Sequence, residues 1–220
     1  MASSRSAARW VGALLFVQLA GLIVPFALLH PMIPPEFLDS AAASTVQVKL
    51  AVGLLFLNCA LTIVIVAILW PVLRRSSETA AVLLLAGSVI MFSLQAIDNA
   101  HLLSMLSLSQ QYVNDSGHGE LLQAMAATVR STRRWVHYSE LFSIELWIGL
   151  LYAVLLRFAL VPRVLAMAGL ATVVLHFGGI VLPFYMGYPS VMPLGMPMGL
   201  SHLTLAGWLV TKGFRETSAT

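Results

Sequence analysis

Long apolar runs are the feature that most constrains this chain. Six stretches carry few charged side chains, and each has the roughly 20 residues that a helix needs to cross the hydrocarbon core of a bilayer. Backbone polar groups in lipid must be satisfied within the protein, and runs of this length favour helices. We therefore predict an all-α, polytopic membrane helical bundle, a single transmembrane domain over residues 1–220, with spans at residues 10–29, 47–73, 79–106, 137–160, 164–186 and 190–212.

The composition agrees with this prediction and excludes several classes of protein. Apolar residues make up 59% of the 220 residues and charged residues only 10%, whereas soluble proteins are about a quarter charged. The net charge of +3 comes from basic residues at segment ends, so we expect the lipid bilayer as a partner and no nucleic acid. The single cysteine, Cys59, excludes an internal disulfide framework and a cysteine-based metal cluster within one chain.

The basic residues also predict the orientation, because cytoplasmic loops are enriched in lysine and arginine. If both termini are cytoplasmic, most of the basic residues lie on the cytoplasmic side. They are those of the N-terminal segment, Arg74, Arg75, Arg157, Arg163, Lys212 and Arg215. The exceptions are Arg130, Arg133 and Arg134 on the long outer loop. We therefore predict a multi-pass protein of the cytoplasmic membrane whose first span is an uncleaved signal anchor.

Three connecting regions have patterns of their own. Residues 30–46 are rich in proline and are predicted to form an external loop. Residues 107–134 are polar, and the helical periodicity of residues 120–129 predicts a short amphipathic helix, which either lies on the outer surface or extends the next span outward. Proline and glycine alternate over residues 193–199, so we expect the sixth span to begin with a bent or locally unwound helix.

Motifs in the second half of the chain carry a family resemblance. They are Leu146-Trp147-Ile148-Gly149 followed by Arg157, then Val161-Pro162-Arg163, and finally Trp208-Leu209-Val210-Thr211-Lys212-Gly213-Phe214. This pattern resembles a bacterial membrane-protein family known as the domain of unknown function 4386, and the resemblance covers nearly the whole chain in length and span spacing. It implies a six-span architecture without an agreed activity. Where members of that family often carry a glutamate, eleven residues before the glycine of the terminal Lys-Gly pair, this chain has His202.

Polar side chains in the third span are expensive in a bilayer and are candidates for function. Gln95, Asp98 and His101 follow one another at i, i+3 and i+6, which places them along one helical face, with Asn99 at its margin.

Further polar side chains occur in the later spans. His137 and Glu140 are three residues apart in the fourth span, and Glu145 follows one to two turns deeper. His176 and His202 fall near the middles of the fifth and sixth spans. Because the third span runs outward and the fourth runs inward, we expect both sets in the outer half of the membrane, where one outward-facing chamber could hold them all.

Several functions fit such a chamber. Asp-x-x-His and His-x-x-Glu on facing helices offer nitrogen and oxygen ligands for a metal, although the repeated Glu-x-x-His set of carboxylate-bridged bundles is absent. His176 and His202 could ligate haem axially. The polar groups could instead hold helices together, for example Asp98 with His101 or His137, and Glu140 with an arginine of the outer loop.

Our leading hypothesis is a chamber that binds a small, lipophilic ligand and performs acid/base chemistry on it, such as isomerisation or cyclisation. Burial raises the pKa of carboxyl groups in general, which lets them exchange protons with a substrate carbon. Asp98 and Glu140 are the predicted acid/base groups, with His101 as their proton partner. The predicted ligand-binding residues are Gln95, Asn99, His137, Glu145, His176 and His202. The competing hypothesis is a non-enzymatic sensor, carrier or accessory membrane protein, and the sequence identifies no cofactor.

Overall fold

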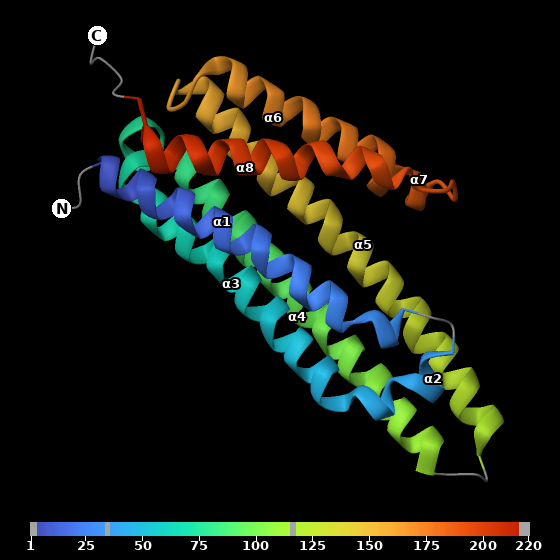
Figure 1. Ribbon diagram of the computed structural model, residues 1–220. Coiled ribbons are helices and arrows are strands. Elements are labelled where there is room, and N and C mark those ends of the chain that lie inside the picture. Colours follow the sequence, from blue (N-terminus) through green and yellow to red (C-terminus); the bar gives the residue numbers. More distant parts are fainter. Residues whose placement is uncertain (1–3, 34–35, 115–117, 216–220) are drawn as a thin grey trace. The chain divides into compact units, whose positions relative to one another are not determined.

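The chain folds as helices joined by short connections (Figure 1). The computed structural model describes residues 4–33, 36–114 and 118–215, and no strand occurs in these ranges. The predicted all-α fold is therefore confirmed.

Five helical stretches in the described ranges are long and apolar enough to cross a membrane. They are Ser4–Leu28, Ala42–Ser76, Glu78–Asn114, Gly119–Arg157 and Arg163–Tyr185. The predicted sixth span corresponds to α8 (Met196–Thr211), whose 16 residues extend about 24 Å at the helical rise per residue, less than a typical hydrocarbon core. The chain is a multi-pass membrane protein, and the predicted count of six spans is approximate.

Two helices are much longer than a bilayer requires. Helix α4 (Glu78–Asn114) has 37 residues and α5 (Gly119–Arg157) has 39, so each extends roughly 55–60 Å. The amphipathic segment at residues 120–129 is the first part of α5, and no break separates it from the predicted fourth span. Of the two predicted placements for this segment, the structure shows the one in which it extends the next span.

The predicted loop at residues 30–46 contains three short helical turns. They are η1 (His30–Met32), α2 (Phe37–Ser40) and η2 (Ala42–Ser44), while residues 34–35 lie outside the described ranges. Ser109 of α4 fixes this connection, because its hydroxyl donates to the Leu38 carbonyl at 2.7 Å and accepts from the Ala42 amide at 2.8 Å.

The chain divides into two compact units, each described by itself below. Unit 1 comprises residues 1–19, 61–91 and 141–220, and unit 2 comprises residues 20–60 and 92–140. Four helices, α1 (Ser4–Leu28), α3 (Thr45–Ser76), α4 and α5, each contribute a stretch to both units.

Unit 2 has its own hydrophobic core, formed by the connection and the facing stretches of α3, α4 and α5. Fully buried members include Phe37, Ala41, Val48, Leu102 and Met105. On α5 the buried residues Leu122 and Ala126 recur at helical spacing, and Val129 packs against the same core. This packing explains why α5 begins as early as Gly119, although its first turns are polar.

Unit 1 is held together by close helix contacts at glycines. Helices α6 (Arg163–His176) and α8 run side by side (Figure 1). Gly169 of α6 lies directly against the fully buried Tyr152 ring, and Gly12 of α1 lies so close to α8 that a Cβ would be 2.6 Å from the Ala206 carbonyl oxygen. These positions require the absence of a side chain.

Basic residues gather at one end of unit 1. Gly213 lies beside Arg5, since a Cβ there would be 3.3 Å from the Arg5 Cγ, and the Arg215 amide donates to the Leu160 carbonyl at 2.9 Å. The start of α1, the end of α8 and the α5–α6 connection therefore meet. Figure 1 shows the α3–α4 connection at this same end of unit 1. We refer to it below as the basic end.

The helix irregularity predicted at residues 193–199 is present. A 3₁₀ turn, η4 (Met192–Gly195), precedes α8, and α6 continues through a π-helical turn, η3 (Phe177–Val181), into α7 (Leu182–Tyr185). Two residues of the intervening connection satisfy carbonyls of η3, because the Val191 amide donates to Gly179 at 2.7 Å and the Ser190 hydroxyl donates to Ile180 at 3.1 Å.

Candidate functional site

An ion pair in unit 2 joins Asp98 of α4 to Arg133 of α5. The Asp98 side chain is 2% exposed and the Arg133 side chain 22%. The guanidinium contacts both carboxylate oxygens, with Nε 3.2 Å from Oδ1 and Nη2 3.3 Å from Oδ2. Such two-point contact is the strong geometry for an arginine and a carboxylate. Arg133 therefore neutralises Asp98, and this accounts for one of the three arginines on the predicted outer loop.

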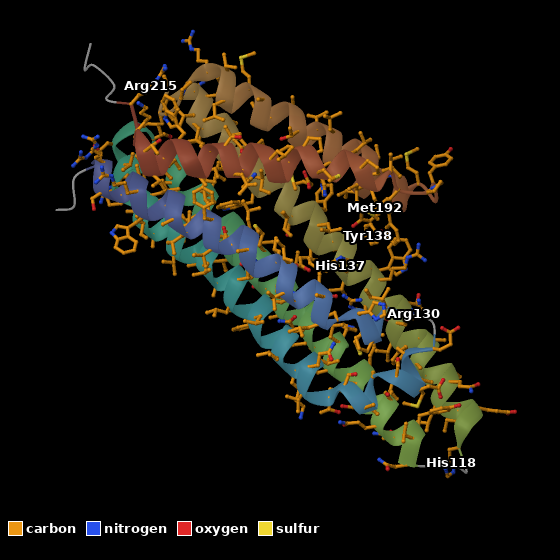
Figure 2. The ribbon with its side chains drawn as sticks, viewed as in Figure 1. His118, Arg130, His137, Tyr138, Met192 and Arg215 are labelled. Atoms are coloured by element: carbon orange, nitrogen blue, oxygen red, sulfur yellow. The ribbon has the colours of Figure 1, made fainter. Side chains whose placement is uncertain are left out.

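His137 lies between two carboxylates in the same unit. Its Nδ1 is 3.5 Å from Oε2 of Glu140, three residues later on α5, and 3.9 Å from Oδ2 of Asp98. Among the described residues, Asp98, His137 and Glu140 form a group whose possible ligand atoms all lie within 4.8 Å of one another. Figure 2 labels His137 on α5, and Arg130 lies earlier on the same helix. We call Asp98, Arg133, His137 and Glu140 the unit 2 cluster.

Gln95 and Asn99 form an amide pair on the face of α4 that carries Asp98. The Gln95 side-chain amide donates to the Asn99 oxygen at 3.1 Å, and the Asn99 amide donates to the Val52 carbonyl of α3 at 3.3 Å. Both residues are buried. They position α4 against α3.

His101 is not a member of this cluster. Its Nδ1 lies 2.9 Å from the Ile97 carbonyl of its own helix, and the residue is only half-buried. Each step of three residues turns a helix about 60° short of a full circle, so His101 lies about 120° around α4 from Gln95. Leu102, which is fully buried, continues the inward face instead.

An open groove lies beside the cluster in unit 2. Its volume is about 640 Å³, and α4 and α5 supply its lining. Apolar side chains such as Ile97 and Trp135 alternate with the hydroxyls of Thr128, Thr132 and Ser139. Lining residues Thr132 and Val136 directly precede cluster residues Arg133 and His137 on α5. The groove therefore runs along the helix that carries most of the cluster.

The remaining predicted residues belong to unit 1, where they form two contacts. Glu145 of α5 and His176, the last residue of α6, meet through Oε1 and Nδ1, and both are largely buried. His202 of α8 lies with its Nδ1 3.4 Å from the Tyr152 hydroxyl, which donates to Ser201 at 3.2 Å. The candidate residues therefore divide into a set in unit 2 and a set in unit 1.

Two residues of these sites were not singled out from the sequence. Arg133 is the ion partner of Asp98, whereas the sequence suggested an outer-loop arginine for Glu140. Its spacing of four residues before His137 and seven before Glu140 places all three on one face of α5, which was a usable signal. Tyr152 lies seven residues after Glu145, and the same helical spacing could have identified it.

The comparison with family models gives one match. The model described as Domain of unknown function (DUF4386) matches residues 10–213. No curated protein and no solved structure matches the chain.

Proposed function

The chain belongs to the family of the domain of unknown function 4386, and because that description states no activity, we propose a function from the geometry of unit 2. The proposal is that unit 2 binds a small lipophilic ligand whose apolar body lies in the groove and whose polar group extends to Asp98, Arg133, His137 and Glu140, where acid/base chemistry takes place.

The observation that carries the proposal is the charge composition of the unit 2 cluster. It combines two carboxylates and one guanidinium with one imidazole, and both carboxylates are buried. With all carboxylates ionised and the imidazole neutral, the cluster would have a net charge of −1. Burying uncompensated charge is unfavourable, and one additional proton would make these four residues neutral. Such a proton would be available for chemistry.

The contacts suggest different roles for the two carboxylates. Asp98 is fixed as the counter-ion of Arg133, which positions it and leaves it ionised. The Nδ1 of His137 and Oε2 of Glu140 are 3.5 Å apart, close enough for a proton to be exchanged between them. We therefore assign acid/base transfer to His137 and Glu140, positioning to Asp98 and Arg133, and contacts with the polar part of the ligand to Gln95 and Asn99.

The groove favours a lipophilic ligand. Its volume of about 640 Å³ lies within the range of roughly 300–1,000 Å³ that is usual for small-molecule sites. Its apolar lining suits an acyl or isoprenoid body, and its threonine and serine hydroxyls suit scattered polar atoms of the ligand. Thr132 directly precedes Arg133, so the groove and the cluster lie on different faces of α5, about 100° apart at this position, and a ligand would reach both by extending around the helix.

We further propose that the basic end of unit 1 is cytoplasmic, in a cytoplasmic membrane. Arg5, Arg157, Arg163, Lys212 and Arg215 support this orientation through the enrichment of basic residues in cytoplasmic loops.

A bound divalent metal is a second candidate for the same cluster. The distances of 3.5 and 3.9 Å from the His137 Nδ1 to the two carboxylates are close to the separation of roughly 3.3 Å between ligands of a tetrahedral site with metal–ligand bonds near 2.05 Å. The guanidinium of Arg133 opposes a second cation next to Asp98. Elemental analysis of the purified protein, compared with His137→Ala, decides between the two candidates.

The main test is identification of the lipid that copurifies with the protein. The extracted lipids of the wild type are compared by mass spectrometry with those of Glu140→Gln and of Glu120→Gln, an exposed glutamate of α5 that serves as a matched control. We expect one lipid species to be enriched in the wild type and in Glu120→Gln and to be depleted in Glu140→Gln. Equal lipid profiles in all three proteins would contradict a ligand site at the cluster.

Acid/base chemistry is tested on that lipid. The wild type should convert it to an isomer or cyclised product, and Asp98→Asn and Glu140→Gln should lose turnover while they remain folded. Turnover that persists in Glu140→Gln would remove the assigned role. Binding without any turnover in the wild type would favour a carrier or sensor.

A further inference from the structure

A second buried acidic group lies in unit 1. Glu145 is 3% exposed, and its Oε1 contacts Nδ1 of His176, whose side chain is 12% exposed. No hydrogen-bond donor reaches the other oxygen, Oε2, from the part of the chain that the structure describes. An ionised carboxylate normally accepts several hydrogen bonds when it is buried. The pair therefore lacks the donors that would stabilise a net negative charge.

The helix irregularities of unit 1 position His176. The π-helical turn η3 begins at the next residue, and π turns occur frequently at functional sites. On the far side of the imidazole, Gly195 leaves room for the ring, because a Cβ there would be 3.1 Å from Cδ2 and 3.5 Å from Nε2 of His176. The ring is thus held between a carboxylate and the start of α8.

A row of hydroxyl and imidazole groups lies on the same helix faces. Thr172 precedes His176 by four residues on α6, and its hydroxyl is 3.0 Å from the Ser201 hydroxyl. Ser201 accepts from the Tyr152 hydroxyl at 3.2 Å, and Tyr152 lies 3.4 Å from Nδ1 of His202. Each of these groups can accept one proton and donate another.

We propose that Glu145 and His176 form an intramembrane proton-binding site and that the Thr172, Ser201, Tyr152 and His202 row exchanges protons with it. The neutral pair holds one proton more than an ionised carboxylate with a neutral imidazole. Release of that proton leaves a charge of −1, and uptake restores neutrality. Each hydroxyl donates its proton to one neighbour and accepts a proton from the other. The protonation state of the row is therefore the same before and after the transfer. Ionisable chains of this kind inside membranes act as proton relays.

This proposal is independent of the one for unit 2. It uses none of the residues of the unit 2 cluster, and its ligand is a proton. Three helices carry the titratable side chains of this proposal. They are Glu145 and Tyr152 on α5, His176 on α6 and His202 on α8.

The test is infrared spectroscopy of the full-length protein in lipid vesicles, recorded as difference spectra between acidic and alkaline pH. A protonated carboxyl group has its own C=O stretching band, which shifts in D₂O. We expect a titrating band that is lost in Glu145→Gln and displaced in His176→Asn, but unchanged in His101→Asn. It should also persist in Glu140→Gln, which separates this proposal from the function of unit 2. The proposal is overturned if the titrating carboxyl bands of Glu145→Gln are the same as those of the wild type.

A second pair of variants keeps the test decisive if Glu145→Gln does not fold. Gly195→Ala adds a methyl group that meets Cδ1 of Ile180 at 2.8 Å and the His176 ring at 3.1 Å, whereas the methyl group of Gly199→Ala, about one turn later, meets nothing within 4 Å. The band should titrate at a different pH in Gly195→Ala and at the wild-type pH in Gly199→Ala. Identical titrations in both variants would show that His176 is not coupled to the carboxyl group.

The relay is tested by the rate of proton uptake after a rapid drop in pH, followed with a soluble pH dye. Tyr152→Phe removes the hydroxyl that joins Ser201 to His202, and uptake by the pair should be slowed while the titration of the carboxyl band is retained. Wild-type rates in Tyr152→Phe would exclude the row as the path.

Discussion

The Asp98–Arg133 pair provides a direct test of the charge composition of the unit 2 cluster. Arg133→Gln removes the guanidinium and leaves Asp98, 2% exposed, without its counter-ion. Removing one partner of a buried ion pair costs about 3–5 kcal/mol, and the 22% exposure of Arg133 lets water screen part of this, so we expect a loss of about 2–4 kcal/mol. At about 2–4 °C per kcal/mol for a chain of this size, the melting temperature should fall by roughly 4–16 °C.

The double variant isolates the interaction. Asp98→Asn with Arg133→Gln removes one negative and one positive charge, so the cluster regains the charge balance of the wild type. The double variant should therefore be more stable than Arg133→Gln alone, with a coupling energy of about 1–3 kcal/mol in the double-mutant cycle. Thermal unfolding in detergent micelles, followed by tryptophan fluorescence, measures all four proteins.

Arg130→Gln is the matched control. Arg130 lies one turn earlier on α5, and its Nη2 donates to the Ile33 carbonyl at 3.2 Å. Because this contact is to a neutral acceptor at an exposed position, we expect a loss of about 1 kcal/mol or less. If the double variant is no more stable than Arg133→Gln, or if Arg130→Gln costs as much, then Asp98 and Arg133 are not a neutralised pair and the argument for an additional proton fails.

Three further substitutions test the packing by the same unfolding assay. Gly169→Ala directs a methyl group into the buried Tyr152 ring and should cost about 1–3 kcal/mol, whereas Gly53→Ala, with nothing within 4 Å, should be neutral or stabilising. Gly12→Ala places its methyl group against a backbone carbonyl that cannot move aside, so a similar cost of about 1–3 kcal/mol is expected, and equal stability with Gly53→Ala would contradict the α1–α8 contact. Ser109→Ala removes two hydrogen bonds to the connection before α3 and should cost about 1–3 kcal/mol; an unchanged melting temperature would mean that these bonds are replaced by water.

The existence of the helices could be predicted from the sequence, because the length of an apolar run is a property of the chain alone. Their ends could not be predicted from hydropathy. Helices α4 and α5 continue into polar sequence because one face still packs on the core of unit 2 through Leu108, Leu122 and Ala126. The informative signal in the polar region was the recurrence of apolar residues every three or four positions. This spacing indicates a helix with one face packed against protein rather than lipid.

Whether two candidate residues share a helix face could be predicted for residues three positions apart in the sequence, but not for residues six positions apart. Asp98 and Gln95 share a buried face, and His137 and Glu140 face one another, as their spacing of three residues indicates. The same rule fails for His101, because it is two such steps from Gln95 and each step of three residues adds a rotation of about 60° around the helix. The partner of Asp98 could not be identified from either helix alone, since that contact depends on how α4 and α5 are aligned within unit 2.

One chamber was expected for all the polar groups because the predicted spans place them at a similar depth in the membrane. Depth is a single coordinate, and residues at one depth on several helices can face different neighbours. Glu145 follows Glu140 by five residues, which turns it about 140° around α5, and its described contact is with His176 of α6 in unit 1. Sharing a depth therefore does not place two residues in one site, and the contacts within each unit define two separate sets.

The two buried groups share a chemical property that explains their residue types. Each contains one more carboxylate than permanent cations: the unit 2 cluster has two carboxylates and Arg133, and the pair in unit 1 has Glu145 alone. In each group a histidine lies in contact with the excess carboxylate. A lysine or arginine would neutralise the charge permanently, whereas a histidine does so only while it holds a proton. Because the groups share no residue, loss of proton exchange in Glu145→Gln with ligand binding retained, and the reverse in Glu140→Gln, would establish two separate sites in one chain.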